Sequence, residues 1–194
     1  MESELNRQEI PVNYLKKSVY GTQLIILVIA ILCIAFFIGT EKFIDDLHLF
    51  KSYKTYLYGF GAGFSLVLFN ILLNYIIPER LLDDGGFNKR FFTSLSVPEM
   101  TILCILIALS EELFFRGFIQ AKFGLIIASV VFALVHFRYV KKPILLTIVL
   151  IESFFLGYLY LKTNNIVIVF IAHFILDYVL GMYMKLSLES EDKE

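Results

Sequence analysis

The chain has 194 residues, of which 58% are hydrophobic and only 18% are charged, and its mean hydropathy is +0.76. This composition excludes a soluble globular domain and is typical of a polytopic membrane protein. The formal net charge of -1 argues against a nucleic-acid-binding protein, in which basic residues would gather on one face. We therefore expect an all-α helix bundle in a lipid bilayer, without a nucleic-acid partner.

Uncharged stretches, compared with the roughly 20 residues that cross a bilayer, predict about six transmembrane helices. They cover residues 23–40, 56–77, 98–121, 124–140, 143–161 and 164–184. The expected organisation is an N-terminal segment 1–22, two helices with polar loops 23–97, a helical core 98–184 and an acidic tail 185–194.

The connections between these stretches carry weaker signals. Residues 41–55 mix apolar and charged side chains, which fits an interfacial helix and a solvated loop equally well. Residues 78–97 are predicted to form a polar loop because they include the run Asp83-Asp84-Gly85-Gly86. Cys33 and Cys104 lie within apolar stretches and are expected to be free thiols.

Lys and Arg residues in the connections predict the orientation, because cytoplasmic loops of membrane proteins are enriched in both. With six spans, the side that holds both termini carries more of these residues than the opposite side. The opposite side carries Lys42, Lys51, Lys54, Lys122 and Lys162. We therefore expect both termini in the cytoplasm.

Two carboxylates and a guanidinium interrupt the apolar stretch 98–121, where Glu111, Glu112 and Arg116 occur. An ionisable group at membrane depth costs roughly 2.5–3.5 kcal/mol on insertion scales, so such groups usually face the bundle interior and mark a functional site. This segment is therefore the centre of a candidate site.

Further polar residues lie at a similar depth in later stretches. His136 is near the end of the fourth stretch, and His173 and Asp177 are in the middle of the sixth. At about 1.5 Å per residue, their distances from the connecting turns resemble those of Glu111 and Glu112. These carboxylates and imidazoles, which can activate water or bind a metal ion, are therefore expected in one layer of the bundle.

Helical spacing separates the roles of these residues. Glu112 and Arg116 are four positions apart and can pair, whereas Glu111 is rotated by about 100° and is freer to face a cavity. His173 and Asp177 are also four positions apart, so that the carboxylate can orient the imidazole or share a ligand with it.

Glu152 is a single carboxylate in the fifth stretch, at a depth that matches the site. Two interpretations of it stay open. It contributes directly to the site or to substrate binding, or it serves packing and pairs with another polar group.

Three short motifs follow one another in the second half of the chain. They read Glu111-Glu112-Leu113-Phe114-Phe115-Arg116, Phe132-Ala133-Leu134-Val135-His136 and His173-Phe174-Ile175-Leu176-Asp177. This order resembles the E-E-x-x-x-R, F-x-x-x-H and H-x-x-x-N or H-x-x-x-D pattern of the CPBP family. That family, also called Abi, comprises intramembrane CAAX proteases and bacteriocin-processing enzymes, and the resemblance covers approximately residues 98–184.

The resemblance implies an intramembrane endopeptidase that hydrolyses a peptide bond near the membrane. Glu111 and His136 would activate the attacking water, and His173 with Asp177 would stabilise the transition state. The implied partners are a peptide or lipidated-peptide substrate and the lipid bilayer. The implied location is the cytoplasmic membrane of a bacterium.

The family has been described both as glutamate-dependent and as metal-dependent. Asp177 stands where the eukaryotic prenyl-processing members have Asn, and an ionised Asp cannot donate a hydrogen bond to an oxyanion but can bind a cation. This favours a divalent metal ion, most simply zinc, over a site without a metal. A subset of Glu111, His136, His173 and Asp177 would bind it.

Two other functional classes stay open. A bacteriocin-immunity or scaffold protein would keep the fold without catalysis. An ion- or proton-coupled transporter could use the same polar residues, although inverted repeats and paired broken helices are not evident in the sequence. The sequence gives no indication of the oligomeric state.

Overall fold

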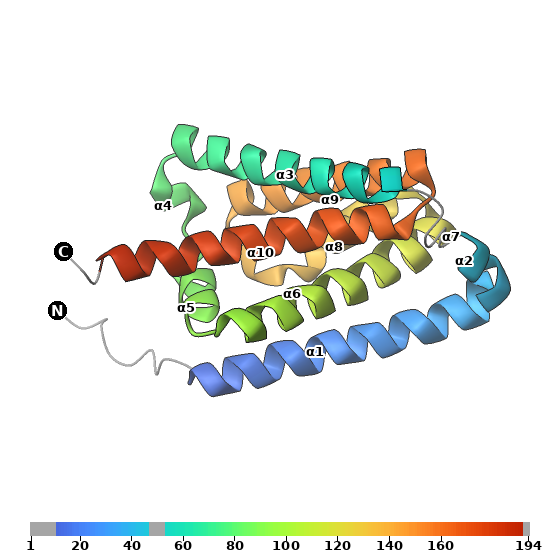
Figure 1. Ribbon diagram of the computed structural model, residues 1–194, viewed down its shortest axis with the longest axis horizontal. Coiled ribbons are helices and arrows are strands. Elements are labelled where there is room, and N and C mark those ends of the chain that lie inside the picture. The colour runs from blue at the N-terminus through green and yellow to red at the C-terminus, as the bar shows by residue number, and fades with distance from the viewer. Residues whose placement is uncertain (1–10, 47–52, 192–194) are drawn as a thin grey trace.

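The computed structural model describes residues 11–46 and 53–191, and all regular elements within them are helices (Figure 1). The first half contains α1 (Val12–Cys33), the π-helix η1 (Ile34–Ile38), α2 (Thr40–Asp46), α3 (Tyr53–Ile76), α4 (Glu79–Leu82) and α5 (Phe87–Thr93). The second half contains α6 (Val97–Glu112), the π-helix η2 (Leu113–Gln120), α7 (Ala121–Phe123), α8 (Leu125–Val135), the 3₁₀ turn η3 (Phe137–Tyr139), α9 (Pro143–Thr163) and α10 (Ile166–Glu191). The predicted all-α bundle is confirmed.

Four helical stretches in the described part of the chain are long and apolar enough to cross a membrane. They are Val12–Ile38, Tyr53–Ile76, Pro143–Thr163 and Ile166–Ser187. Their apolar surfaces define an integral membrane protein. The other two predicted spans are built differently, since residues 98–121 divide into α6 and the π-helix η2, and residues 124–140 contain only the 11-residue helix α8. At about 1.5 Å per residue, α8 reaches only about half way across a hydrocarbon core of roughly 30 Å.

Several predicted boundaries differ from the structure. Helix α1 begins at Val12, inside the predicted N-terminal segment, and α10 continues to Glu191, inside the predicted tail. The predicted polar loop 78–97 contains the short helices α4 and α5. Of the segment 41–55, α2 and the start of α3 are helical. Residues 1–10, 47–52 and 192–194 lie outside the described part, and so do the predictions that concern them.

The long helices run side by side, with α10 between α3 and α6 and with α1 along the outer side of α6 (Figure 1). The start of α1 and the end of α10 lie at the same end of the bundle, next to α4 and α5 (Figure 1). Helices α2 and α7 lie at the opposite end. Polar side chains from α1, α6 and α10 can therefore meet inside the bundle.

Helices α3 and α10 approach each other unusually closely at two glycines. A Cβ atom built on Gly59 would lie 2.8 Å from Cβ of Ile171, and one on Gly63 would lie 2.7 Å from Cβ of Ile175. Real Cβ atoms essentially never come so close, so only glycine fits at these positions without a shift of the backbone. The contact fixes α10, the helix that carries His173, against α3.

The start of α6 is fixed by a capping box. The Ser96 hydroxyl accepts a hydrogen bond from the Glu99 backbone N–H at 3.4 Å, and the Glu99 carboxylate accepts one from the Ser96 backbone N–H at 2.8 Å. Lys16 of α1 pairs with the same carboxylate at 3.4 Å. These contacts hold α1 and α6 in register at the end of the bundle where α1 begins and α10 ends.

We expect single-cysteine labelling to place the two ends of the bundle on opposite sides of the membrane. In a variant without Cys33 and Cys104, Lys141→Cys should react with an impermeant thiol reagent only from the cytoplasm. Lys122→Cys should react only from the opposite side, because the Lys and Arg bias predicts that the end of the bundle with Lys141 is cytoplasmic. Labelling of position 122 from the cytoplasm would reverse the orientation.

Candidate functional site

The ion pair between Glu112 and Arg116 lies in the interior of the bundle, and both residues have 0% exposure. Oε2 of Glu112 is 3.2 Å from Nε of Arg116, at ion-pair distance but without the alignment of a hydrogen bond. Nη2 of Arg116 donates to the backbone oxygen of Ser153 at 3.2 Å and to its hydroxyl at 3.3 Å. The guanidinium lies 5.0 Å from the centre of the Phe132 ring. Arg116 therefore connects its own segment with α9 and α8.

His173 of α10 brings three carboxylates together. Its Nδ1 atom lies 2.8 Å from Oε1 of Glu112. Its Nε2 atom lies 3.5 Å from Oδ2 of Asp177 and 3.9 Å from Oε2 of Glu111. The short contact that orients the ring thus comes from Glu112 and not from Asp177, which the sequence spacing had suggested. Glu112 accordingly has two partners, Arg116 and His173, where the sequence indicated only the first.

Glu111 is also hydrogen-bonded from α1. Nε2 of Gln23 donates to Oε1 of Glu111 at 2.8 Å, and the hydroxyl of Ser110 donates to Oε1 of Gln23. All three residues are buried. The sequence analysis missed Gln23, although its single amide within the apolar stretch 23–40 was a usable signal, because a buried amide needs a polar partner.

His136 is the residue at which α8 ends. Its Nδ1 atom lies 2.8 Å from the backbone oxygen of Phe132. Because a carbonyl oxygen only accepts hydrogen bonds, Nδ1 carries a proton, and in the neutral ring Nε2 has a free lone pair. The Phe132 ring centre lies 4.9 Å from that of His136 and 6.2 Å from that of His173. Phe132 thus lies between the two imidazoles, and no hydrogen bond joins His136 to Glu111 among the described residues.

Glu152 of α9 is paired with α3. Nδ2 of Asn70 donates to Oε1 of Glu152 at 2.6 Å. This hydrogen bond supplies the polar partner that one of the two interpretations of Glu152 requires. Its neighbour Ser153 accepts from Arg116, so α9 contacts the site through Ser153.

The predicted metal site depends on how the four proposed ligands are arranged. In the described part of the chain, no group of three or more His, Cys, Asp or Glu side chains is arranged to hold a metal ion. The four predicted ligands therefore do not fit a metal site in this arrangement, and zinc binding stays a prediction.

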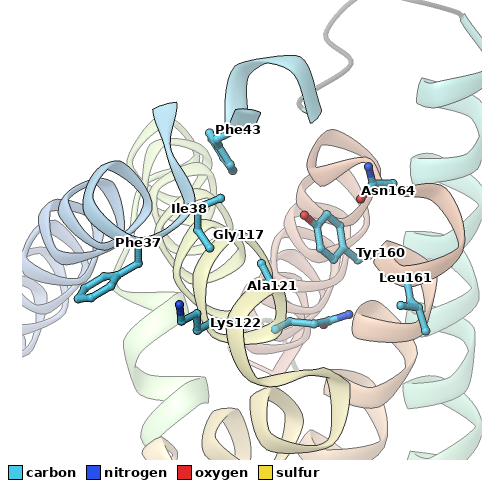
Figure 2. A pocket seen from close by; sticks show the side chains of 10 residues that line it. Phe37, Ile38, Phe43, Gly117, Ala121, Lys122, Tyr160, Leu161 and Asn164 are labelled. Atoms are coloured by element: carbon cyan, nitrogen blue, oxygen red, sulfur yellow. The ribbon is translucent and has the colours of Figure 1, made fainter. Parts of the chain in front are cut away.

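A hollow of about 490 Å³ lies away from this cluster, at the end of the bundle near α2 and α7. Figure 2 shows Phe43, Lys122, Tyr160 and Asn164 around it. None of the predicted site residues lines it. The size of a cavity thus does not indicate the candidate site, which is defined by the polar cluster around His173.

The fold and the site together define a polytopic α-helical membrane protein with a buried cluster of carboxylates, imidazoles and one guanidinium. The family model "Type II CAAX prenyl endopeptidase Rce1-like" matches residues 93–179, which include all three motifs. The chain belongs to this CAAX-protease family, the CPBP family that the motifs resemble.

Two relatives extend the match beyond these residues. The uncharacterized protein YpbD of Bacillus subtilis is 35% identical over 172 residues, which cover 89% of this chain and 91% of YpbD. The UPF0177 protein YxdF of Lactococcus lactis is 32% identical over 124 residues, which cover 56% of this chain and 67% of YxdF. No solved structure matches the chain.

Proposed function

We propose that the chain is an intramembrane endopeptidase in which Glu111 and His136 activate a water molecule. The observation that supports this most directly is the position of Glu111. Its Oε1 atom accepts from Gln23, and its Oε2 atom faces Nε2 of His173 at 3.9 Å. Gln23 thus holds Oε1 of Glu111 by a hydrogen bond, and Oε2 of Glu111 lies near the imidazole of His173.

In the proposed reaction, water binds between Oε2 of Glu111 and Nε2 of His136. Both atoms can accept a proton, since Nδ1 of His136 already donates to Phe132. As the water oxygen attacks the scissile carbonyl, Glu111 takes one of its protons. The same proton then passes to the amine that leaves when the peptide bond breaks.

His173 is proposed to stabilise the negative charge that develops on the carbonyl oxygen. Its Nδ1–H group donates to the carboxylate of Glu112, and in the proposed reaction the ring carries a second N–H at Nε2. A donor fixed in advance toward an oxyanion commonly supplies about 3 to 4 kcal/mol of transition-state stabilisation. Asp177, 3.5 Å from Nε2, would accept from this N–H when no substrate is bound.

The proposed substrate is a peptide or lipidated peptide that enters from the cytoplasm or from the bilayer. We propose the cytoplasmic membrane of a bacterium as the location, because YpbD and YxdF come from Bacillus subtilis and Lactococcus lactis. The family description supports a prenylated C-terminus as one substrate class.

Cleavage of defined peptides by the purified protein in proteoliposomes tests the proposal. The panel would contain internally quenched peptides that end in a CAAX sequence, each with and without a farnesyl group. We expect cleavage of at least one peptide by the wild type and no cleavage by Glu111→Gln. An intact fold without any cleavage would contradict the proposal and favour an immunity or scaffold protein.

Zinc dependence is tested separately, on the same preparation. The sequence predicts stoichiometric zinc in protein purified without chelators, loss of cleavage on chelation and recovery when zinc is added back. Full cleavage by a preparation shown to be free of metal would reject zinc and leave Glu111 as an unaided general base.

A further inference from the structure

We infer that Gln23 of α1 is a positioning residue that holds Glu111 in its reactive orientation. The inference rests on the proposed function, since it assigns Glu111 as the base. It adds a residue from outside the segment that matches the family model, residues 93–179. Helix α1 thereby becomes part of the site and not only a membrane anchor.

The exposure pattern of α1 makes Gln23 exceptional. Most of this helix is open to its surroundings, and the buried residues between Val12 and Cys33 are Leu15, Gln23 and Ala30. Their spacing of eight and seven residues places all three on one face, which packs against α6. A Leu at position 23 would satisfy a packing role alone. A buried amide costs free energy unless its hydrogen bonds are made.

The nitrogen and the oxygen of the Gln23 amide both form hydrogen bonds. Nε2 donates to Oε1 of Glu111 at 2.8 Å, and Oε1 accepts from the Ser110 hydroxyl. The Glu111 carboxylate determines which way the amide faces, because an ionised carboxylate only accepts hydrogen bonds and the amide nitrogen must lie on its side. Oε1 of Gln23 then faces the Ser110 hydroxyl, which also lies 3.1 Å from the backbone oxygen of Ile107, and this contact helps to hold the amide in place.

The hydrogen bond restricts the Glu111 carboxylate. With Oε1 held by Gln23, the side chain cannot rotate freely, and Oε2 stays on the side of His173. Glu112, the neighbouring carboxylate, is fixed by Arg116 and His173 on its own face of the helix. Arg116 and the short contact with His173 thus hold Glu112, whereas Gln23 of α1 holds one oxygen of Glu111.

The test compares Gln23→Leu and Gln23→Glu with the wild type in the proteoliposome cleavage assay. Leu removes both hydrogen bonds, and Glu keeps the shape but replaces the donor with a second carboxylate. A hydrogen bond to a charged group is strong enough that kcat should fall roughly 10- to 100-fold in both variants. KM should change little, because Gln23 acts on Glu111 and not on the substrate.

Ser110→Ala separates positioning from packing. This variant keeps the Nε2 donor but removes one of the two hydrogen bonds that hold the amide, so kcat should fall less than in Gln23→Leu. The double variant Gln23→Leu/Ser110→Ala should have the same kcat as Gln23→Leu, since Ser110 acts through Gln23. Thr22→Val is the matched control. It removes an exposed hydroxyl that donates to the Ser18 backbone oxygen within α1, and it should leave kcat unchanged.

The outcomes distinguish this inference from the proposed function. Unchanged kcat in Gln23→Leu, with cleavage lost in Glu111→Gln, would overturn the role of Gln23 and keep that of Glu111. Full cleavage by Glu111→Gln would overturn both. A fall in kcat that matches a fall in the folded fraction, measured by thermal unfolding, would show that Gln23 is only structural.

Discussion

Replacement of Glu111 by Gln is expected to abolish peptide cleavage while the protein stays folded. Gln keeps the shape of the side chain and can still bond to Gln23, but it cannot take a proton from water. Loss of a general base commonly lowers the rate by about 10² to 10⁴. The kcat of the purified variant in proteoliposomes measures the effect, and thermal unfolding checks the fold.

His136→Ala is expected to lower kcat to a similar extent, because it removes the second proton acceptor beside the water. The exposed Glu79 of α4 provides a control at a distance from the site, and Glu79→Gln should cleave at the wild-type rate. Turnover at the wild-type level in either Glu111→Gln or His136→Ala would contradict the assignment of the water-activating pair.

The main effect of Glu112→Gln is expected to be a lower free energy of unfolding, with any change in the cleavage rate as a secondary effect. Arg116 and Glu112 both have 0% exposure, and Nη1 of Arg116 has no hydrogen-bond partner among the described residues. The substitution would leave a buried guanidinium without its counter-charge and would weaken the contact that orients His173. Removal of one partner from a buried ion pair costs about 3 to 5 kcal/mol.

Thermal unfolding in detergent measures this loss, which corresponds to a fall in Tm of roughly 10 °C for a chain of this size. Glu152→Gln is the matched control. Its amide oxygen can still accept from Asn70, so its Tm should stay close to that of the wild type. Equal Tm values for Glu112→Gln and the wild type would show that the pair does not stabilise the fold.

The sequence predicts the parts of the fold that depend on local composition. Long apolar runs specify long helices, and α3, α9 and α10 lie where such runs were found. The length of α8 was overestimated because a hydropathy pattern does not indicate where a helix ends. The backbone leaves the helical region at His136 (φ -79°, ψ 50°), although the sequence remains apolar around it. Amino-acid composition also does not predict that residues 98–121 divide into α6 and a π-helix.

The sequence predicted contacts between residues of one motif. It did not predict contacts between side chains on different helices. Spacing of four residues pairs Glu112 with Arg116, and the ion pair is present. Spacing also favours Asp177 as the partner of His173, but the shorter contact comes from Glu112 on another helix. Gln23 belongs to none of the three motifs, and its contact with Glu111 spans 88 positions of the chain. Only tertiary packing brings these groups together.

The two glycine contacts between α3 and α10 restrict how a substrate can reach the site. Since Cβ atoms at positions 59 and 63 would already collide with Ile171 and Ile175, this seam has no clearance for a peptide or a lipid chain. The helix that carries His173 and Asp177 is therefore a fixed wall on this side. In the proposed function, a substrate that enters from the bilayer would therefore pass between other helices.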